Sequence, residues 1–133
     1  MTVKDFINRV FVVEYKGLID SGFHYISFAL MGLGIEFLGA CLDAHEFGTR
    51  GQSTTRFKLA IRKLFPRKYH AYGSELCADL RNGFAHQFRP GFQFVLTHRA
   101  ESAREGTAHL GPFGKQTVLV AEDLYRDFQD ACR

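Results

Sequence analysis

The sequence predicts a mainly α-helical bundle of about four to five helices, with a small antiparallel β-hairpin in its C-terminal third. Three observations predict this fold class. Apolar residues recur at helical spacing over most of residues 1–88, residues 23–42 form one long apolar segment, and β-forming residues cluster only after residue 91. At 133 residues, 46% of them hydrophobic, the chain is long enough for a single domain, residues 1–133, with its own core.

The first helix is expected to run from Val3 to about Tyr15, or on to Ile19, because apolar residues repeat there at spacings of three and four. Thr2 and Asp5 resemble a capping box, in which each side chain accepts a hydrogen bond from the other residue's backbone. The run from residue 20 to residue 22, Asp-Ser-Gly, then indicates a turn.

The apolar segment from Phe23 to Leu42 is long enough to cross a membrane. Its composition favours a buried central helix instead, because it contains His24 and Glu36, and a carboxylate near a bilayer centre costs about 2.5–3.5 kcal/mol. Gly32 and Gly39 lie seven residues apart and would let a neighbouring helix approach closely. We therefore expect no membrane association.

A further helix is expected to begin with a cap at Ser53 or Thr54 and to end at Pro66. One face of it is apolar, and the other face and the residues after it are basic: Arg56, Lys58, Arg62, Lys63, Arg67 and Lys68. No acid occurs between Glu46 and Glu75, so a chain of net charge +3 contains a strongly basic stretch. Two interpretations stay open, a solvated helix face and a surface that contacts nucleic-acid phosphates.

Two tyrosines follow this basic stretch. Tyr69 and Tyr72 could stack on bases, or they could cover the helical bundle.

After residue 88 the pattern changes. Arg89-Pro90-Gly91 ends the preceding helix, and a strand is expected over Phe92–His98. We expect a polar loop over residues 100–115, with a short strand at Thr107–Leu110, and another strand at Gln116–Val120. The last helix is expected over Ala121–Cys132, with three residues facing inward: Leu124, Phe128 and Ala131.

The stretch from Ser74 to Phe88 predicts an amphipathic helix with Ser74 as its N-cap. An apolar stripe lies opposite a polar row made of Glu75, Asp79, Asn82 and His86. Arg81 lies at the border of the apolar stripe, where the short side chains of its neighbours leave room for a guanidinium group.

Glu36 is the one acid inside the apolar segment, and a buried carboxylate needs a partner. We expect Arg81 or Asn82 to lie within hydrogen-bonding distance of Glu36, the alternative being that Glu36 points to solvent. Asp43, seven residues later, falls on the same helix face and is expected to border the same site.

The order Arg81, Asn82, then His86 five positions after the arginine resembles the signature of HEPN domains, small all-helical modules of many bacterial toxins and RNA-processing proteins. The resemblance covers residues 2–88. It implies metal-independent RNA cleavage, in which a ribose 2′-hydroxyl attacks the adjacent phosphate and leaves a 2′,3′-cyclic end. His86 suits the proton transfer, because the pKa of histidine lies near neutrality, and Arg81 suits the phosphate charge.

The resemblance also implies an assembly. Residues five apart on a helix point about 140° from each other, so a two-fold homodimer with His86 near the axis would be needed to bring both groups to one cleft. In this reading, Asn82 orients the imidazole or the phosphate, and Glu36 holds Arg81. Some HEPN toxins carry a tyrosine two residues after the histidine for nucleotidyl transfer by an antitoxin. Here that position is Phe88, so such control is not expected.

Two functions follow. One is a HEPN-type endoribonuclease, a toxin or defence component, with RNA, a second copy of the chain and an antitoxin or other protein as partners. The other is a non-catalytic HEPN-like module that dimerises or binds a nucleotide or a protein. No cofactor or metal is expected, because the six histidines show no zinc-ligand spacing. Three widely spaced cysteines indicate reduced thiols in the cytoplasm.

Overall fold

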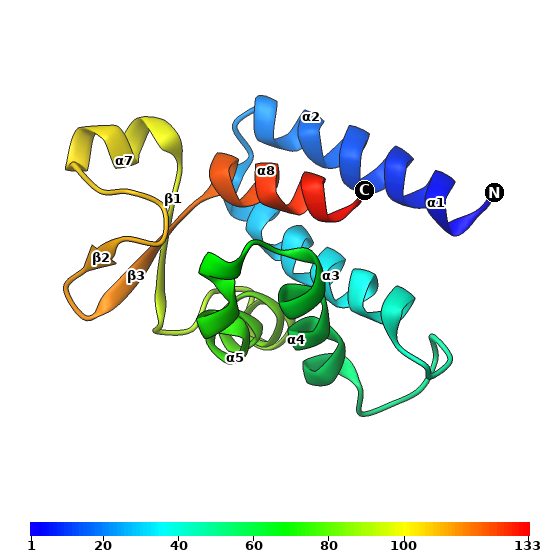
Figure 1. Cartoon of the computed structure of the whole chain (residues 1–133). Coiled ribbons are helices and arrows are strands. Elements are labelled where there is room, and N and C mark those ends of the chain that lie inside the picture. The colour runs from blue at the N-terminus through cyan, green and yellow to red at the C-terminus, as the bar shows by residue number, and fades with distance from the viewer.

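The computed structural model describes all 133 residues as helices followed by a small sheet and a final helix (Figure 1). One long helix comprises α1 (Val3–Phe6), the π-helical η1 (Ile7–Glu14) and α2 (Tyr15–Asp20), followed by α3 (His24–Leu42), α4 (Ser53–Leu64) and the 3₁₀ turn η2 (Arg67–Tyr72). A second continuous helix comprises α5 (Gly73–Leu76), the π-helical η3 (Cys77–Asn82) and α6 (Gly83–Gln87). The remaining elements are β1 (Phe94–Thr97), α7 (Arg99–Glu105), β2 (Pro112–Phe113), β3 (Gln116–Val120) and α8 (Ala121–Ala131).

The predicted fold class is confirmed. Helix α3 lies at the centre and contacts α2, α4, η3 and α8, as the apolar segment predicts. Its length and composition would allow a membrane span, but 56% of the apolar window is buried inside the protein, as expected for a core helix.

Two glycines of α3 let its neighbours approach, as predicted. An ideal Cβ on Gly32 would lie 3.0 Å from the carbonyl carbon and oxygen of Leu80 in η3. A Cβ on Gly39 would overlap the backbone of Arg56 in α4. Glycine is therefore needed where α3 crosses these two helices.

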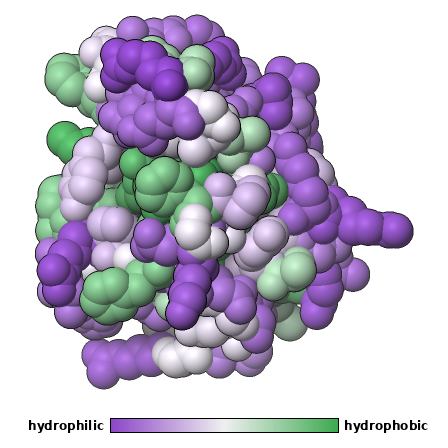
Figure 2. Space-filling view, turned by 90° about the vertical axis from the view of Figure 1, so that its left-hand side faces the viewer, coloured by the Kyte–Doolittle hydropathy of each residue, from purple (hydrophilic) through white to green (hydrophobic).

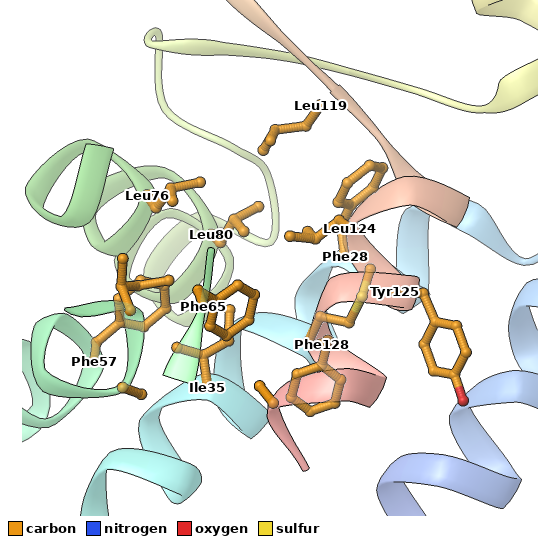
Figure 3. Close-up of a cluster of buried hydrophobic side chains, with 14 of the residues drawn as sticks. Phe28, Ile35, Phe57, Phe65, Leu76, Leu80, Leu119, Leu124, Tyr125 and Phe128 are labelled. Carbon is orange, nitrogen blue, oxygen red and sulfur yellow. The ribbon is translucent and has the colours of Figure 1, made fainter. Parts of the chain in front are cut away.

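The core lies between α3, α4, η3 and α8 (Figure 3). Phe28 and Ile35 of α3 meet Leu80 of η3 and Leu124 and Phe128 of α8 in one buried cluster. Each such side chain contributes about 1.5–3 kcal/mol when fully buried. The predicted inward residues of the last helix are all buried, so that prediction is confirmed: Leu124, Phe128 and Ala131.

The sheet has the strand order β1-β3-β2. Strands β2 and β3 form the small antiparallel hairpin, but β1 pairs parallel to β3, which the sequence did not reveal. The strand expected at Thr107–Leu110 is wrong, and α7 occupies part of the expected loop. Helix α7 is what allows the parallel pairing, because a parallel connection needs a crossover segment between the two strands.

The sheet and α7 form one end of the molecule, on the left in Figure 1. Figure 2 shows this end face on: hydrophobic residues gather in the middle of the face, and hydrophilic residues surround them. The large side chains of Phe92, which precedes β1, and Phe113, in β2, are exposed.

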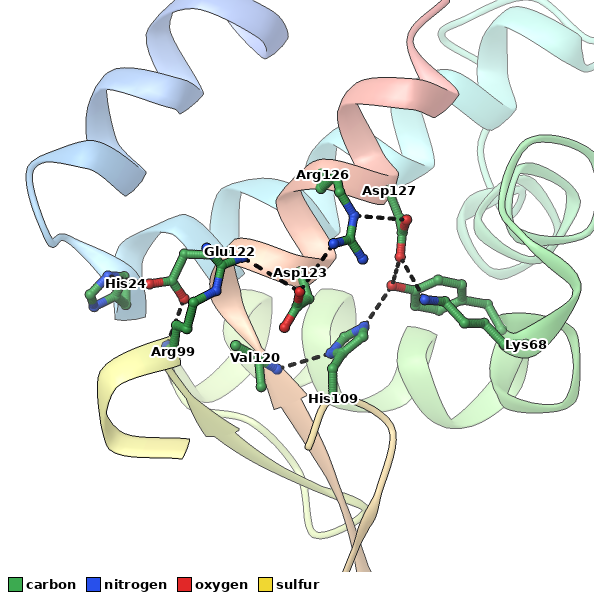
Figure 4. A network of polar contacts seen from close by, with 10 residues as sticks. His24, Lys68, Arg99, His109, Val120, Glu122, Asp123, Arg126 and Asp127 are labelled. Atoms are coloured by element: carbon green, nitrogen blue, oxygen red, sulfur yellow. Dashed lines mark hydrogen bonds and ion pairs between the residues drawn. The ribbon is translucent and has the colours of Figure 1, made fainter. Parts of the chain in front are cut away.

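A buried polar network attaches η2 to α8 (Figure 4). The Tyr69 hydroxyl donates to Asp127 Oδ2 at 2.5 Å, and His109 Nδ1 accepts from the Val120 backbone N–H at 3.0 Å. The proton of the neutral imidazole is therefore on Nε2, which donates to the Tyr69 oxygen at 2.6 Å. Burial lowers the pKa of His109 to about 4, so the ring is neutral at pH 7.

The helix starts agree with the sequence in one case out of three. Thr2 and Asp5 form the expected capping box. Neither Ser53 nor Thr54 is the N-cap of α4, which begins at Ser53, after Gln52. Ser74 is not the N-cap of α5, which begins at Gly73, after Tyr72. Neither Gln52 nor Tyr72 makes a side-chain cap hydrogen bond. At Ser74 the reason is that η2 continues directly into α5.

Candidate functional site

The helix that carries the Arg81–His86 motif contains a π-helical segment at the motif itself. Helices α5, η3 and α6 are continuous, and the Gly83 backbone N–H donates to the Ala78 carbonyl oxygen, five residues back. The wider π turn changes the angles at which side chains leave the helix. Such segments occur often at functional sites.

Arg81 and Glu36 form an ion pair. The Arg81 Nε donates to Glu36 Oε1 at 2.7 Å, and Nη1 donates to Asn82 Oδ1 at 3.4 Å. Both side chains of the pair are 24% exposed, so the guanidinium is fixed but remains reachable from solvent. The expected contact between Glu36 and Arg81 is confirmed, and the alternative, in which Glu36 points freely to solvent, is wrong.

Arg81 also lines a groove of about 150 Å³. The other lining residues come from α3 and from α6 with the residue after it: Ile26, Ala29, Leu30, Leu33, Phe84, Ala85 and Phe88. His86 is exposed and does not line this groove. Within one chain, the structure thus brings together Arg81, Asn82 and Glu36 and leaves His86 outside their groove.

Asp79 does not belong to a solvated face. It is 2% exposed, and its Oδ2 accepts hydrogen bonds from the backbone N–H groups of Gln93 and Phe94, both at 2.8 Å. Burial raises the pKa of Asp79, and the two backbone donors oppose that shift. Asp79 therefore anchors the start of β1 on the motif helix.

Asp43 does not join the Arg81 pair, contrary to the sequence prediction. It follows the last turn of α3, where its Oδ2 accepts from Arg56 Nε at 2.8 Å and its Oδ1 lies 2.7 Å from His45 Nδ1. These hydrogen bonds, with Arg56 first, hold the pKa of Asp43 well below its usual range.

Arg56 is correspondingly not an RNA-contacting residue. It is 5% exposed and also donates to the backbone carbonyl oxygens of Phe47 and Glu46. The close packing at Gly39 places this first turn of α4 against α3, which turns Arg56 inward. Helical periodicity assigned it to the basic face and could not show this contact.

The other basic residues are exposed, as predicted: Lys58, Arg62, Lys63, Arg67 and Lys68. Lys68 Nζ lies 3.3 Å from Asp127 Oδ2, so part of its charge is neutralised. Tyr69 is fully buried and cannot stack on bases, and the Tyr72 ring packs edge-on against Phe94. Of the two interpretations of the tyrosines, covering the bundle is confirmed for Tyr69.

Sequence reasoning missed one polar hollow, of about 160 Å³, between the start of α3 and the end of β1. The rings of His24 and His98 stack there with centroids 4.5 Å apart, and Glu122 lies 3.8 Å from His24. These residues are far apart in sequence, so no local pattern could have joined them. No group of three or more His, Cys, Asp or Glu side chains is placed to hold a metal ion.

Comparison with family models, with curated proteins and with solved structures finds no match to this chain.

Proposed function

We propose that this protein is a HEPN-type endoribonuclease that cleaves RNA without a metal ion. The observation that carries the proposal is the Arg81–Glu36 pair at 2.7 Å on a partly exposed motif helix. Because Glu36 accepts a hydrogen bond from Nε of Arg81, it fixes the orientation of the guanidinium and so the direction of the remaining N–H groups. Such a fixed fork suits phosphate oxygens.

In the proposed reaction the 2′-hydroxyl oxygen attacks the adjacent phosphorus, and the bond from phosphorus to the 5′-oxygen breaks. His86 takes the proton of the 2′-hydroxyl, and a water molecule gives a proton to the leaving 5′-oxygen and regains one from the imidazolium. General acid–base catalysis of this kind contributes about 10²–10⁴-fold. Arg81 stabilises the extra negative charge that develops on the phosphate oxygens.

A homodimer is required to bring Arg81 and His86 to one cleft. The groove beside Arg81 offers a surface for it, because its apolar lining includes side chains that solvent reaches: Ile26 is 46%, Leu33 48% and Phe88 62% exposed. A two-fold axis through this surface would bring two copies of α6 together. In light scattering we expect a dimer for the unchanged chain and a monomer for Leu33→Asp.

The second candidate is a non-catalytic HEPN-like module that dimerises or binds a nucleotide or another protein. The position of His86 favours it, because the imidazole is exposed outside the groove that contains Arg81. The toxin or defence setting, the cytoplasmic location and an antitoxin partner belong to the first candidate and are proposed with it.

The discriminating experiment incubates the protein with single-stranded RNA in EDTA. We expect cleavage products with 2′,3′-cyclic ends from the unchanged protein and intact RNA from His86→Ala. Gln87→Ala is the matched control, since Gln87 is the next residue and is also exposed. Intact RNA with the unchanged, dimeric protein would reject the nuclease and leave the module. Cleavage that survives in His86→Ala would reject the assigned role of His86.

A further inference from the structure

A pocket of about 350 Å³ lies between α4 and the chain that leads from η2 into α5. Its polar lining consists of Lys58, Arg62, His70, Ser74 and Glu75. The volume is at the lower end of the range for small-molecule sites. None of the ion pairs of the chain involves Lys58 or Arg62, so both cations are available to an anionic ligand.

The acid of this pocket has no partner. Oε2 of Glu75 is sealed from solvent without a hydrogen bond, and Glu75 makes no ion pair in the chain. A buried acceptor left unsatisfied is costly, so this carboxylate favours a ligand that brings N–H donors. The last torsion of a glutamate is soft. Binding of such a ligand in the pocket therefore requires Oε2 to turn out of its covered position, and rotation about this torsion allows that.

Lys58 and Arg62 also line a second hollow, of about 270 Å³, with Thr54, Thr55 and Leu59. The two cations are one helical turn apart and lie between the hollows. A strand that crosses this ridge would place its phosphates on the two cations. One nucleotide would then lie in each hollow.

We propose that the pocket with Glu75 binds a guanine base of single-stranded RNA. Guanine presents two adjacent donors, N1–H and N2–H, on its Watson–Crick edge, and a carboxylate accepts from both. Bases of single-stranded RNA are recognised through such edges and through flat side chains. His70 supplies a flat side chain at the pocket. Its ring is held in place by a hydrogen bond between Nε2 and the Phe65 carbonyl oxygen at 3.0 Å.

This inference rests on the proposed function, since RNA is the ligand, and adds a base preference to it. Glu75 lies eleven residues before His86 on one continuous helix. That separation is about 16 Å along the axis. The guanine therefore binds away from the bond that is cut, and the base preference applies to a nucleotide that flanks the cleavage site.

Isothermal titration of the full chain with GMP, AMP and inorganic phosphate tests the proposal. We expect GMP to bind about tenfold or more tightly than AMP and phosphate to compete with both. Glu75→Gln is expected to lower the ratio of the GMP and AMP affinities to about one. Lys58→Ala is expected to weaken the binding of both nucleotides by the same factor, and Lys115→Ala, an exposed cation outside both hollows, to change neither affinity.

Equal affinities for GMP and AMP would overturn the proposal, as would no binding of either, or a preference for GMP that survives Glu75→Gln. Thermal unfolding checks that each variant is folded. Glu75→Asp, which withdraws the carboxylate by one carbon, is the second variant and is expected to lower the ratio of the two affinities. RNA cleavage without a GMP preference would reject this inference alone. A Glu75-dependent GMP preference without cleavage would reject the nuclease alone.

Discussion

Alanine at position 39 would place a methyl group where the backbone of α4 now lies. An ideal Cβ on Gly39 overlaps the carbonyl group of Arg56 and comes within 2.9 Å of its Cα. Because these are backbone atoms, no side-chain rotation relieves the clash, and α3 and α4 must separate. Overpacking of a core costs about 1–3 kcal/mol and sometimes more, and the separation also disturbs the buried Arg56–Asp43 pair. We expect Gly39→Ala to lower the free energy of unfolding by about 3 kcal/mol or more, even after the helix-propensity gain of about 1 kcal/mol.

Urea unfolding followed by circular dichroism measures this loss, and two other glycines calibrate it. Gly32→Ala should cost less, because its Cβ would lie 3.0 Å from Leu80 and a small shift of η3 suffices. Gly17→Ala should stabilise by up to about 1 kcal/mol, because nothing lies within 4 Å of its Cβ position. A Gly39→Ala protein as stable as the unchanged chain, or more stable than Gly32→Ala, would refute the reasoning about close packing.

Three further predictions concern buried polar groups. Tyr69→Phe leaves the Nε2–H of His109 without its acceptor and should cost about 1–3 kcal/mol in urea unfolding; a negligible loss would contradict the network. The pKa of His109 is lowered from 6.5 to about 4 in the folded protein, so its stability contribution is complete above pH 6.5 and is lost as pH falls toward 4, by up to about 3 kcal/mol. His109→Gln should flatten stability against pH in that window, and an unchanged slope would argue against a buried neutral ring. Asp79→Ala removes the acceptor of two backbone N–H groups and should cost about 2 kcal/mol or more and speed amide exchange at Phe94; full protection there would count against the anchor.

The helical part of the fold could be predicted from local patterns in the sequence. The capping box at Thr2 and the periodicity of α4 are local signals, and the structure agrees with both. Glu36, the partly buried acid of α3, needs a partner, and the position of Arg81 at the border of the apolar stripe predicted it correctly. Each of these features depends on residues close together in sequence or, for Glu36, on a single charged group in an apolar segment.

Other features depend on contacts between distant segments, which periodicity does not encode. Arg56 reads as part of a basic face, yet Asp43 and two carbonyl oxygens draw it inward. Asp79 reads as part of a polar row, yet two backbone N–H groups from the next segment cover it. The parallel pairing of β1 with β3 was not predicted, because the residues of α7 show no clear helical periodicity that would have indicated a crossover helix between the strands.

The most direct test of the proposed nuclease is the rate of RNA cleavage in EDTA by two inactive variants, alone and mixed. Arg81→Gln keeps a hydrogen-bond donor for Glu36, and His86→Ala removes an exposed side chain, so both should fold. If Arg81 and His86 act across a subunit boundary, each variant alone leaves RNA intact, and an equimolar refolded mixture recovers part of the unchanged protein's rate. A mixture as inactive as its components would contradict the shared site, and intact RNA with the unchanged protein would contradict the nuclease itself.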